Sequence, residues 1–312
     1  MKGVILAAGK GSRLYPVTHH IPKPLLPLAN RITLAYAFDK LKEIGIREIA
    51  LVVGENEPLM RERLGDGSEF GIELTYVRQP EPKGLAHAVS FAGDFVNREP
   101  FVLYLGDAIY ADPLPPFEEK FRSSGCANLN VVKWVEDPSR FGVANLDGDR
   151  ILRLVEKPAQ PESNMAMAGL YFFGPQLWDL LPNLQPSARG EYEITDAIQL
   201  LIDAGHLVLA KEHPGEWFDT GTLDSFLQTS RYLCGEDVRL AADAKVQGTV
   251  SGHLVVGEGA EVEATSLENV VVLPGARVRV QGSIRDAILG GEVEVSGDVR
   301  RQVIWGGESI SY

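Results

Sequence analysis

The sequence predicts an α/β protein with a Rossmann-like, mostly parallel sheet, a β-rich insertion and, after these, a short left-handed β-helix. Strand-like and helix-like segments alternate over the first two-thirds of the 312 residues, an order typical of parallel sheets covered by helices. Beyond residue 236 the sequence instead repeats every sixteen residues, which is typical of a solenoid. We therefore expect one domain at 1–236 and a second, β-helical domain at 237–312.

The elements of the first domain follow from hydrophobic patterning. The apolar run Val4–Leu6 predicts a strand covered on both faces. A helix is expected over 33–45, because its apolar residues share one face and Gly45 supplies a stop. Further strands are predicted at 48–53, 73–77 and 101–105, and helices at 59–64 and 85–95. The β-rich insertion holds strands at 128–135, 141–146, 151–155 and 168–173. After it, helices are expected near 175–182, 193–204 and 223–233.

The repeat of the last quarter has three registers. The first contains Leu240, Val256, Val272, Ile288 and Ile304, the second Ala244, Ala260 and Ala276, and the third Val246, Val262 and Val278. Pieces such as Val256–Val262 resemble the hexapeptide repeats of left-handed β-helices. Glu294 breaks the third register, so we expect a cap at the end. Chance alternation of valine and glycine is the alternative.

The charge is unevenly distributed. The chain has a formal net charge of −13, yet its first 38 residues hold no acidic side chain and five cations, Lys2, Lys10, Arg13, Lys23 and Arg31. A cationic patch on an acidic protein favours an anionic small molecule over nucleic acid or a membrane surface. Only two cysteines are present, and no apolar run reaches the roughly twenty residues of a membrane span. We expect a cytoplasmic protein, with a homo-oligomer possible.

A glycine-rich loop follows the first strand. Gly9 and Gly11 let the backbone turn tightly and bring N–H groups to an anion, and Arg13 adds a fork for phosphate oxygens. The dinucleotide fingerprint is excluded, because Leu14 stands where its third glycine would be. A Walker loop is excluded because Lys10 precedes Gly11. The loop predicts a phosphate site; an ordinary glycine turn is the alternative.

Lys23 lies between Pro22 and Pro24, which predicts an extended and rigid backbone. A cation held in this way stabilises developing phosphate charge without reorganising. A solvated lysine in a proline-rich loop is the alternative.

Two carboxylates follow apolar segments. Asp107 comes after the strand 101–105, and Asp219 after Trp217 and Phe218. Ligands of open parallel sheets bind beyond the carboxyl ends of the strands, and Mg²⁺ prefers one or two carboxylates together with phosphate oxygens. Both aspartates are thus candidate magnesium ligands, with turn capping as the alternative.

Glu156, Lys157 and Pro158 form a further candidate site. A sugar hydroxyl suits the glutamate and its phosphate suits the lysine. Adjacent strand residues point to opposite faces, so both roles require a bend near Pro158. A surface ion pair is the alternative.

These residues together resemble the sugar-1-phosphate nucleotidyltransferase family, most closely its long-form glucose-1-phosphate thymidylyltransferases. The segment 6–14 is similar to the signature loop of the family and 22–27 to its second motif. Other similar segments are 79–88, 141–143, 155–158, 190–196 and 217–221. The long form also carries a β-helical tail, so the resemblance covers nearly the whole chain.

The resemblance implies Mg²⁺-dependent transfer of a nucleotidyl group, from dTTP by preference, to glucose 1-phosphate, giving dTDP-glucose and pyrophosphate. It makes Arg13, Lys23 and Asp107 catalytic, and Asp107 and Asp219 the metal ligands. The nucleotide would contact Leu6, Ala8, Gly9, Gly11, Arg13, Lys23, Gln79, Gly84 and Asp107. Of these, Gln79 and the Gly84 backbone would read the base. The sugar phosphate would contact Gly142, Glu156, Lys157 and Gly169.

The sequence departs from the family at three places. Ala108 replaces an asparagine, Pro24 stands where thymidylyl enzymes often have glutamine, and Asn30-Arg31-Ile32 lacks the usual Lys-Pro. The Pro24 change weakens the case for deoxyribose recognition.

Several alternatives therefore stay open. One is a transferase using UTP, GTP or ATP with glucose or mannose phosphate, and another is a non-catalytic subunit that senses nucleotide sugars. A β-helical acyltransferase would have only His253 to use in that domain.

Overall fold

The computed structural model describes residues 1–235 and 237–312, and its packing divides them into two compact units. The first unit holds 1–9 and 36–217, and the second holds 10–35 and 218–312. The predicted domain boundary at residue 236 lies outside the described residues.

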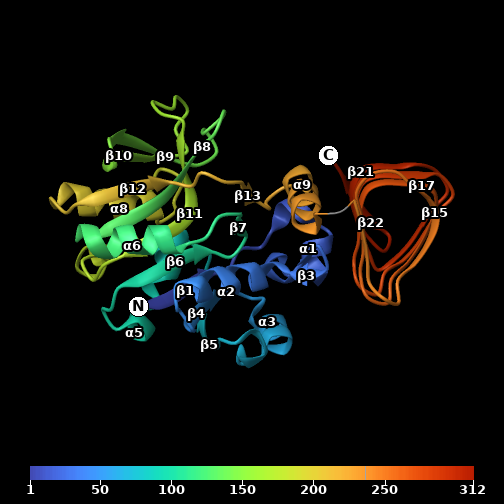
Figure 1. Ribbon diagram of the computed structural model, residues 1–312, viewed down its shortest axis with the longest axis horizontal. Helices are drawn as coiled ribbons and strands as arrows, with labels where there is room; N and C mark the ends of the chain where they lie inside the picture. Colours follow the sequence, from blue (N-terminus) through green and yellow to red (C-terminus); the bar gives the residue numbers. More distant parts are fainter. Residues whose placement is uncertain (236) are drawn as a thin grey trace. The chain divides into compact units, whose positions relative to one another are not determined.

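The first unit is built on a nine-stranded sheet (Figure 1). Four strands at one side are parallel: β5 (Glu73–Arg78), β4 (Glu48–Val53), β1 (Lys2–Leu6) and β6 (Phe101–Leu105). The side chains of Val4 and Ile5 in β1 are fully buried, as a strand covered on both faces requires. The predicted parallel core is therefore confirmed for this half.

The other half of the sheet is mixed, so the prediction of a mostly parallel sheet is wrong there. β11 (Met165–Phe173) runs antiparallel to β6 and to β8 (Asn128–Trp134). Beyond β8 lie the parallel strand β12 (Val208–Glu212) and the antiparallel β10 (Arg150–Glu156) and β9 (Gly142–Asp147). The predicted insertion adds strands to the same sheet, because β11 extends the hydrogen bonding of β6.

Helices complete the core of this unit. They are α2 (Thr33–Glu43), which starts in the second unit, α3 (Glu57–Leu64), α4 (Leu85–Ser90), α5 (Gly93–Val96), α6 (Pro115–Ser124), α7 (Leu177–Leu180) and α8 (Ile194–Asp203), with the 3₁₀ turns η3 (Ser68–Phe70) and η4 (Leu181–Asn183). The helix predicted at 85–95 is split between Ser90 and Gly93, where the glycine lowers helix propensity. β7 (Ala108–Tyr110), α6 and β12 were not predicted.

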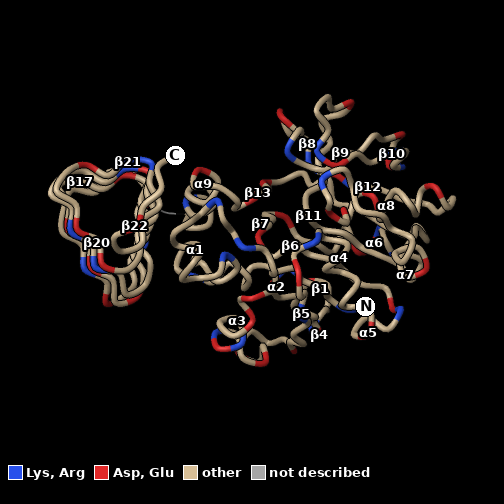
Figure 2. The backbone as a smooth tube through the Cα atoms, turned by 180° about the vertical axis from the view of Figure 1, so that it is seen from behind, with Lys and Arg blue, Asp and Glu red and all other residues tan. Residues whose placement is uncertain are grey.

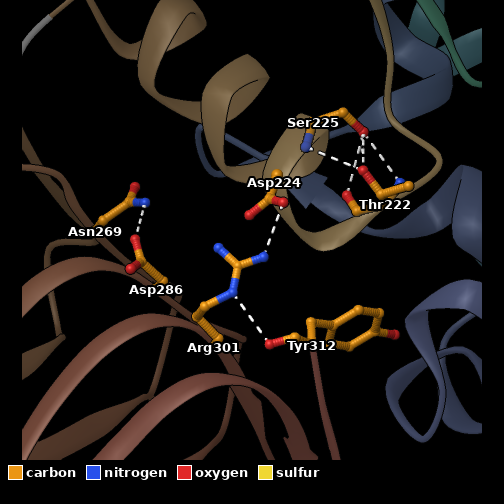
Figure 3. Close-up of polar contacts among 7 residues, drawn as sticks. All are labelled: Thr222, Asp224, Ser225, Asn269, Asp286, Arg301 and Tyr312. Atoms are coloured by element: carbon orange, nitrogen blue, oxygen red, sulfur yellow. Dashed lines mark hydrogen bonds and ion pairs between the residues drawn. The ribbon is translucent and has the colours of Figure 1, made fainter.

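The second unit joins the N-terminal loop region to the C-terminal coils. Its first part holds η1 (Ser12–Leu14), α1 (Val17–His20), η2 (Lys23–Leu25) and the hairpin of β2 (Pro27–Leu28) and β3 (Arg31–Ile32). β13 (Trp217–Asp219) leads to α9 (Leu223–Cys234). This helix starts at a capping box, in which Thr222 and Ser225 each accept a backbone N–H of the other (Figure 3).

Parallel coils follow α9. Their strands are β14 (Val238–Leu240), β15 (Lys245–Val250), β16 (Leu254–Val256), β17 (Glu261–Val272), β18 (Arg277–Val280), β19 (Ser283–Gly290), β20 (Glu292–Val295) and β21 (Val299–Trp305). The last strand, β22 (Glu308–Ser311), runs antiparallel to β21 and ends the parallel stack, as a cap does. Parallel coils are present as predicted. Their left-handed winding stays a prediction.

The sixteen-residue register slips after Val272. This residue pairs with Leu289 rather than with Ile288, and Ile288 pairs with Val303. Val278 correspondingly pairs with Val293, so Glu294 lies opposite Arg279 instead of inside the coil. One long coil followed by one short coil keeps the apolar side chains buried, which a strict repeat could not do here.

Charged side chains form ladders across the coils. Glu261 lies opposite Arg277, and Arg277 lies opposite Glu292. Figure 2 shows blue and red segments on neighbouring coils. Opposite charges directly across a strand pair stabilise a sheet modestly. We therefore assign these charged side chains a role in stabilising the coils.

Candidate functional site

The carboxyl edge of β1 and β6 is the topological switch point of the first unit. The chain leaves β1 for β4 on one side and returns to β6 on the other. The strand ends are neighbours, because Leu6 pairs with Leu105 and Gly106 N donates to the Leu6 carbonyl over 3.0 Å. Ala8, Gly9 and Asp107 therefore leave the sheet from one edge, which is where open α/β sheets bind ligands.

The start of the glycine-rich loop is held firmly. Asn56 Nδ2 donates to the Ala7 carbonyl over 2.9 Å, and Asn56 Oδ1 accepts from Gly54 N over 3.0 Å. A Cβ at Gly54 would lie 3.1 Å from the Ala8 carbonyl oxygen, so the two backbones approach closely. Asn56 was not predicted, because its bond to Ala7 joins residues 49 positions apart.

Gln79 and Gly84 follow β5 within the same unit. Gln79 is 6% exposed, its backbone N donates to the Val53 carbonyl over 2.8 Å, and its Nε2 donates to the Gly84 carbonyl over 3.3 Å. Gly84 has φ +110°, and a Cβ there would lie 2.4 Å from the Tyr192 carbonyl oxygen. Only glycine fits this position. The two residues assigned to base reading are thus directly bonded.

The second unit brings the cationic residues together. A Cβ at Gly11, which has φ +64°, would lie 3.0 Å from Lys23 Cβ, so the signature loop packs against the second motif. Lys23 Nζ lies 4.0 Å from Asp219 Oδ1. A Cβ at Gly221 would lie 2.8 Å from Arg13 Nη2 and from Asp219 Oδ1 alike. Arg13, Lys23 and Asp219 therefore surround one point of this unit.

The backbone at Lys23 differs from the predicted extended form. Residues Lys23–Leu25 make the 3₁₀ turn η2, in which Leu26 N donates to the Lys23 carbonyl over 3.1 Å. Pro24 permits this turn, since it lies in the first positions, where a missing N–H costs nothing. The lysine is 8% exposed, so the platform is rigid although it is not extended.

The end of the coils contacts the loop that carries Arg13. The Tyr312 hydroxyl donates to the Arg13 carbonyl, and the ring of Trp305 stacks on His20 at 4.5 Å. Arg301 bonds the Tyr312 carbonyl over 3.1 Å and Asp224 over 3.0 Å (Figure 3). No sequence motif indicated the bond from Tyr312 to the Arg13 carbonyl, because it joins residues 299 positions apart.

A cavity of about 680 Å³ lies beside β10 in the first unit. Glu156 and Lys157 line it, together with Arg189, Glu193 and Asp196. The bend required after Glu156 is present, because Lys157 has φ +41° and its N donates to the Phe141 carbonyl over 3.0 Å. Lys157 Nζ lies 3.4 Å from Glu156 Oε1, so both side chains face the same region.

Arg189 is a functional candidate that sequence reasoning missed. Its guanidinium lies 3.5 Å from Glu156 and 3.3 Å from Glu193. Burial and Glu156 raise the pKa of both Glu193 and Asp196, so the acidic groups crowd this cavity. An arginine among acids, beside a lysine, can bind an anion and a hydroxyl-rich ligand together. Its place just before the 190–196 motif was the available signal.

The two glycines assigned to the sugar phosphate lie at different places. Gly142 pairs with Glu156 across the strands, and a Cβ on it would lie 3.2 Å from Glu156 Oε2 and 2.5 Å from Thr195 Cγ2. Gly169 has φ +87° at a bulge in β11 and packs on Leu105. Gly142 therefore shapes the Glu156 side of the cavity, whereas Gly169 packs next to the end of β6.

Within 1–235 and 237–312, no group of three or more His, Cys, Asp or Glu side chains is placed to hold an ion. No helix of these ranges has the length and apolar character that a membrane crossing needs.

A family model described as Nucleotidyl transferase matches residues 2–236 of the chain. The chain belongs to this family. It is therefore an enzyme of the nucleotidyl transfer class, as the signature loop and the β1–β6 switch point indicated.

Curated relatives match nearly the full chain. The low-salt glycan biosynthesis nucleotidyltransferase Agl11 of Haloferax volcanii is 41% identical over 93% of this chain and 92% of its own. The glucose-1-phosphate thymidylyltransferase of Streptomyces antibioticus is 38% identical over 95% of this chain and 80% of its own.

Solved structures match three-quarters of the chain. A Bacillus anthracis protein assigned as a glucose-1-phosphate thymidylyltransferase, in complex with sucrose, superposes with a TM-score of 0.70 and 38% identity over 75% of this chain and 95% of its own. A UDP-glucose pyrophosphorylase bound to UDP-glucose superposes with a TM-score of 0.68. It is 26% identical over 74% of this chain and 97% of its own.

Proposed function

We propose that this enzyme transfers a nucleotidyl group from a nucleoside triphosphate, dTTP by preference, to glucose 1-phosphate, releasing pyrophosphate and dTDP-glucose. The observation that carries the proposal is the switch point. There the signature loop follows β1, and Asp107 follows the neighbouring strand β6. The relatives named glucose-1-phosphate thymidylyltransferase support the choice of substrates. The name of Agl11 gives no nucleotide. Transfer from another nucleoside triphosphate, or to another sugar phosphate, is therefore the second candidate function.

The chemistry requires little of the protein beyond positioning and charge. A phosphate oxygen of the sugar phosphate attacks the α-phosphorus, and the bond from the α-phosphorus to the bridging oxygen breaks as pyrophosphate leaves. The attacking oxygen is already anionic, so no strong base is needed. Arg13 and Lys23 would neutralise the triphosphate, and the buried, rigid position of Lys23 means that little reorganisation accompanies the reaction.

Magnesium is part of this proposal, with Asp107 and Asp219 as its protein ligands. The donor chemistry fits, because Mg²⁺ uses one or two carboxylates and takes its other oxygens from water and substrate phosphates. When bound, the ion would supply charge stabilisation at the phosphates.

The sugar phosphate would occupy the cavity beside β10. Glu156 can accept sugar hydroxyls, while Lys157 and Arg189 can bind the phosphate. Gly142 would keep the space beside Glu156 open.

The test measures pyrophosphate release with a panel of nucleoside triphosphates against glucose 1-phosphate and mannose 1-phosphate. Lys23→Ala and Asp107→Ala should each lower turnover by at least about a hundredfold, the range for loss of one stabilising group. Lys245→Ala, which removes an exposed cation from the coils, serves as control and should keep full activity. Near-normal turnover in both site variants would remove the mechanism. Nucleotide binding without any turnover would support the sensing subunit instead.

A further inference from the structure

The side-chain amide of Gln79 has both of its protons engaged. Nε2 donates to the Gly84 carbonyl over 3.3 Å and faces His87 Nδ1 at 3.0 Å. An amide nitrogen has two protons, so these two acceptors use its donor capacity completely. The other end of the planar amide, Oε1, is thereby left to present an acceptor.

His87 is held where this contact requires it. It lies in the first turns of α4, with its ring stacked on Tyr192 at 6.0 Å and edge-on to Phe91 at 4.9 Å. Tyr192 in turn is tied to this segment, because its N donates to the Lys83 carbonyl over 2.8 Å and its carbonyl accepts from Ala86 N over 3.0 Å. The imidazole therefore cannot easily turn away from Gln79.

We propose that His87 is a positioning residue for nucleotide selection. It accepts a hydrogen bond from Gln79 Nε2 and so fixes Gln79 Oε1 as the acceptor for a ring N–H of the base. Thymine and uracil carry that N–H at position 3, whereas cytosine has an acceptor there. The inference deepens the proposed function and rests on it, together with the base-reading role that the family resemblance implies for Gln79.

The arrangement depends on the protonation of His87. A neutral ring can accept at Nδ1 only when its proton is on Nε2. In the charged ring, Nδ1 becomes a donor that faces the Gln79 donor, and the amide must turn or withdraw. Gly84 still favours the original orientation through its carbonyl, so the selectivity weakens without vanishing.

The charged groups around His87 are Lys83 and Glu81, which pair with each other, and Tyr192 lies against its ring. Burial and Lys83 lower the pKa of His87 below the ordinary value of 6.5. The ring is thus neutral at physiological pH, and selectivity for thymine should fall as the pH drops through this lowered value.

Two variants separate the hydrogen bond from the packing of the ring. His87→Asn keeps an acceptor, its side-chain oxygen, near the position of Nδ1 but removes the ring. His87→Phe keeps a ring to stack on Tyr192 but has no acceptor. His206→Asn changes a histidine outside this cluster and serves as the control.

The experiment measures equilibrium binding of dTTP and of dCTP to the full-length protein by calorimetry, from about pH 5.5 to 8. Both nucleotides carry the same triphosphate, so its own titration cancels in the ratio of the two dissociation constants. His87→Phe should lower the preference for dTTP by about three- to tenfold at pH 8, which corresponds to one hydrogen bond. It should also abolish the low-pH loss. His87→Asn should keep the preference at every pH, and His206→Asn should behave as the wild type.

A His87→Phe protein with the preference and pH profile of the wild type would overturn the inference. So would equal losses in His87→Phe and His87→Asn, because the ring rather than the acceptor would then matter. Selective binding that depends on His87 without pyrophosphate release would sustain the inference and refute the proposed function. Pyrophosphate release with a preference for dTTP that does not depend on His87 would do the reverse, and failure to bind either nucleotide would refute both.

Discussion

Gly84→Ala tests whether the nucleotide-reading segment depends on one close backbone approach. Gly84 has φ +110° and ψ 169°, a region that only glycine occupies readily. The new Cβ would also lie 2.4 Å from the Tyr192 carbonyl oxygen and 2.7 Å from Tyr192 N, which are backbone atoms that cannot rotate away. Backbone strain costs about 1–3 kcal/mol and overpacking about as much again. We therefore expect the free energy of unfolding to fall by about 2–6 kcal/mol.

The control is Gly125→Ala, which has φ +65° and open space around its Cβ position. This variant carries only the left-handed backbone penalty, about 1–2 kcal/mol. Urea denaturation of both proteins gives the difference in the free energy of unfolding. The KM for dTTP should rise at least about tenfold in Gly84→Ala only, because the bond from Gln79 to Gly84 is displaced. Equal stability and equal KM values in the two variants would refute the reasoning.

Two further predictions follow from the contacts above. Burial and Glu156 raise the pKa of Asp196, so its ionisation opposes folding and stability falls as the pH rises through that pKa. Asp196→Asn should therefore raise the Tm at pH 7 and leave it unchanged near pH 3. Equal Tm shifts at the two pH values would contradict a raised pKa of Asp196. Tyr312→Phe removes the hydroxyl that bonds the Arg13 carbonyl and should raise the nucleotide KM by about two- to tenfold. Tyr232→Phe on α9 is its control, and an unchanged KM in Tyr312→Phe would show that the contact does not position the loop.

Much of the site could be predicted from short segments of the sequence. The β1 strand and its glycine loop, Asp107 after β6, and the bend after Glu156 all follow from short stretches in which apolar runs, glycines and strand ends have fixed meanings. The resemblance to sugar nucleotidyltransferases came from the same stretches, and the family match sustains it.

Other parts of the site could not be read in this way. Contacts with residues on other elements give three residues their place in the site: Asn56, Arg189 and His87. A single asparagine, arginine or histidine in a sequence does not predict such contacts. The extended backbone expected at Lys23 was wrong, because two prolines restrict the chain without choosing between an extended form and a 3₁₀ turn.

By itself, the sequence determined many of the strands and helices, the repeat of the coils and the chemistry of the loop, since hydrophobic period and glycine or proline conformation act over a few residues. Only the tertiary structure decided the antiparallel course of β11, the slip that pairs Val272 with Leu289, and the bond from His87 to Gln79. These features depend on which distant segments pack together. Alternative pairings of the same strands bury similar apolar surface, so the packing of the whole chain selects among them.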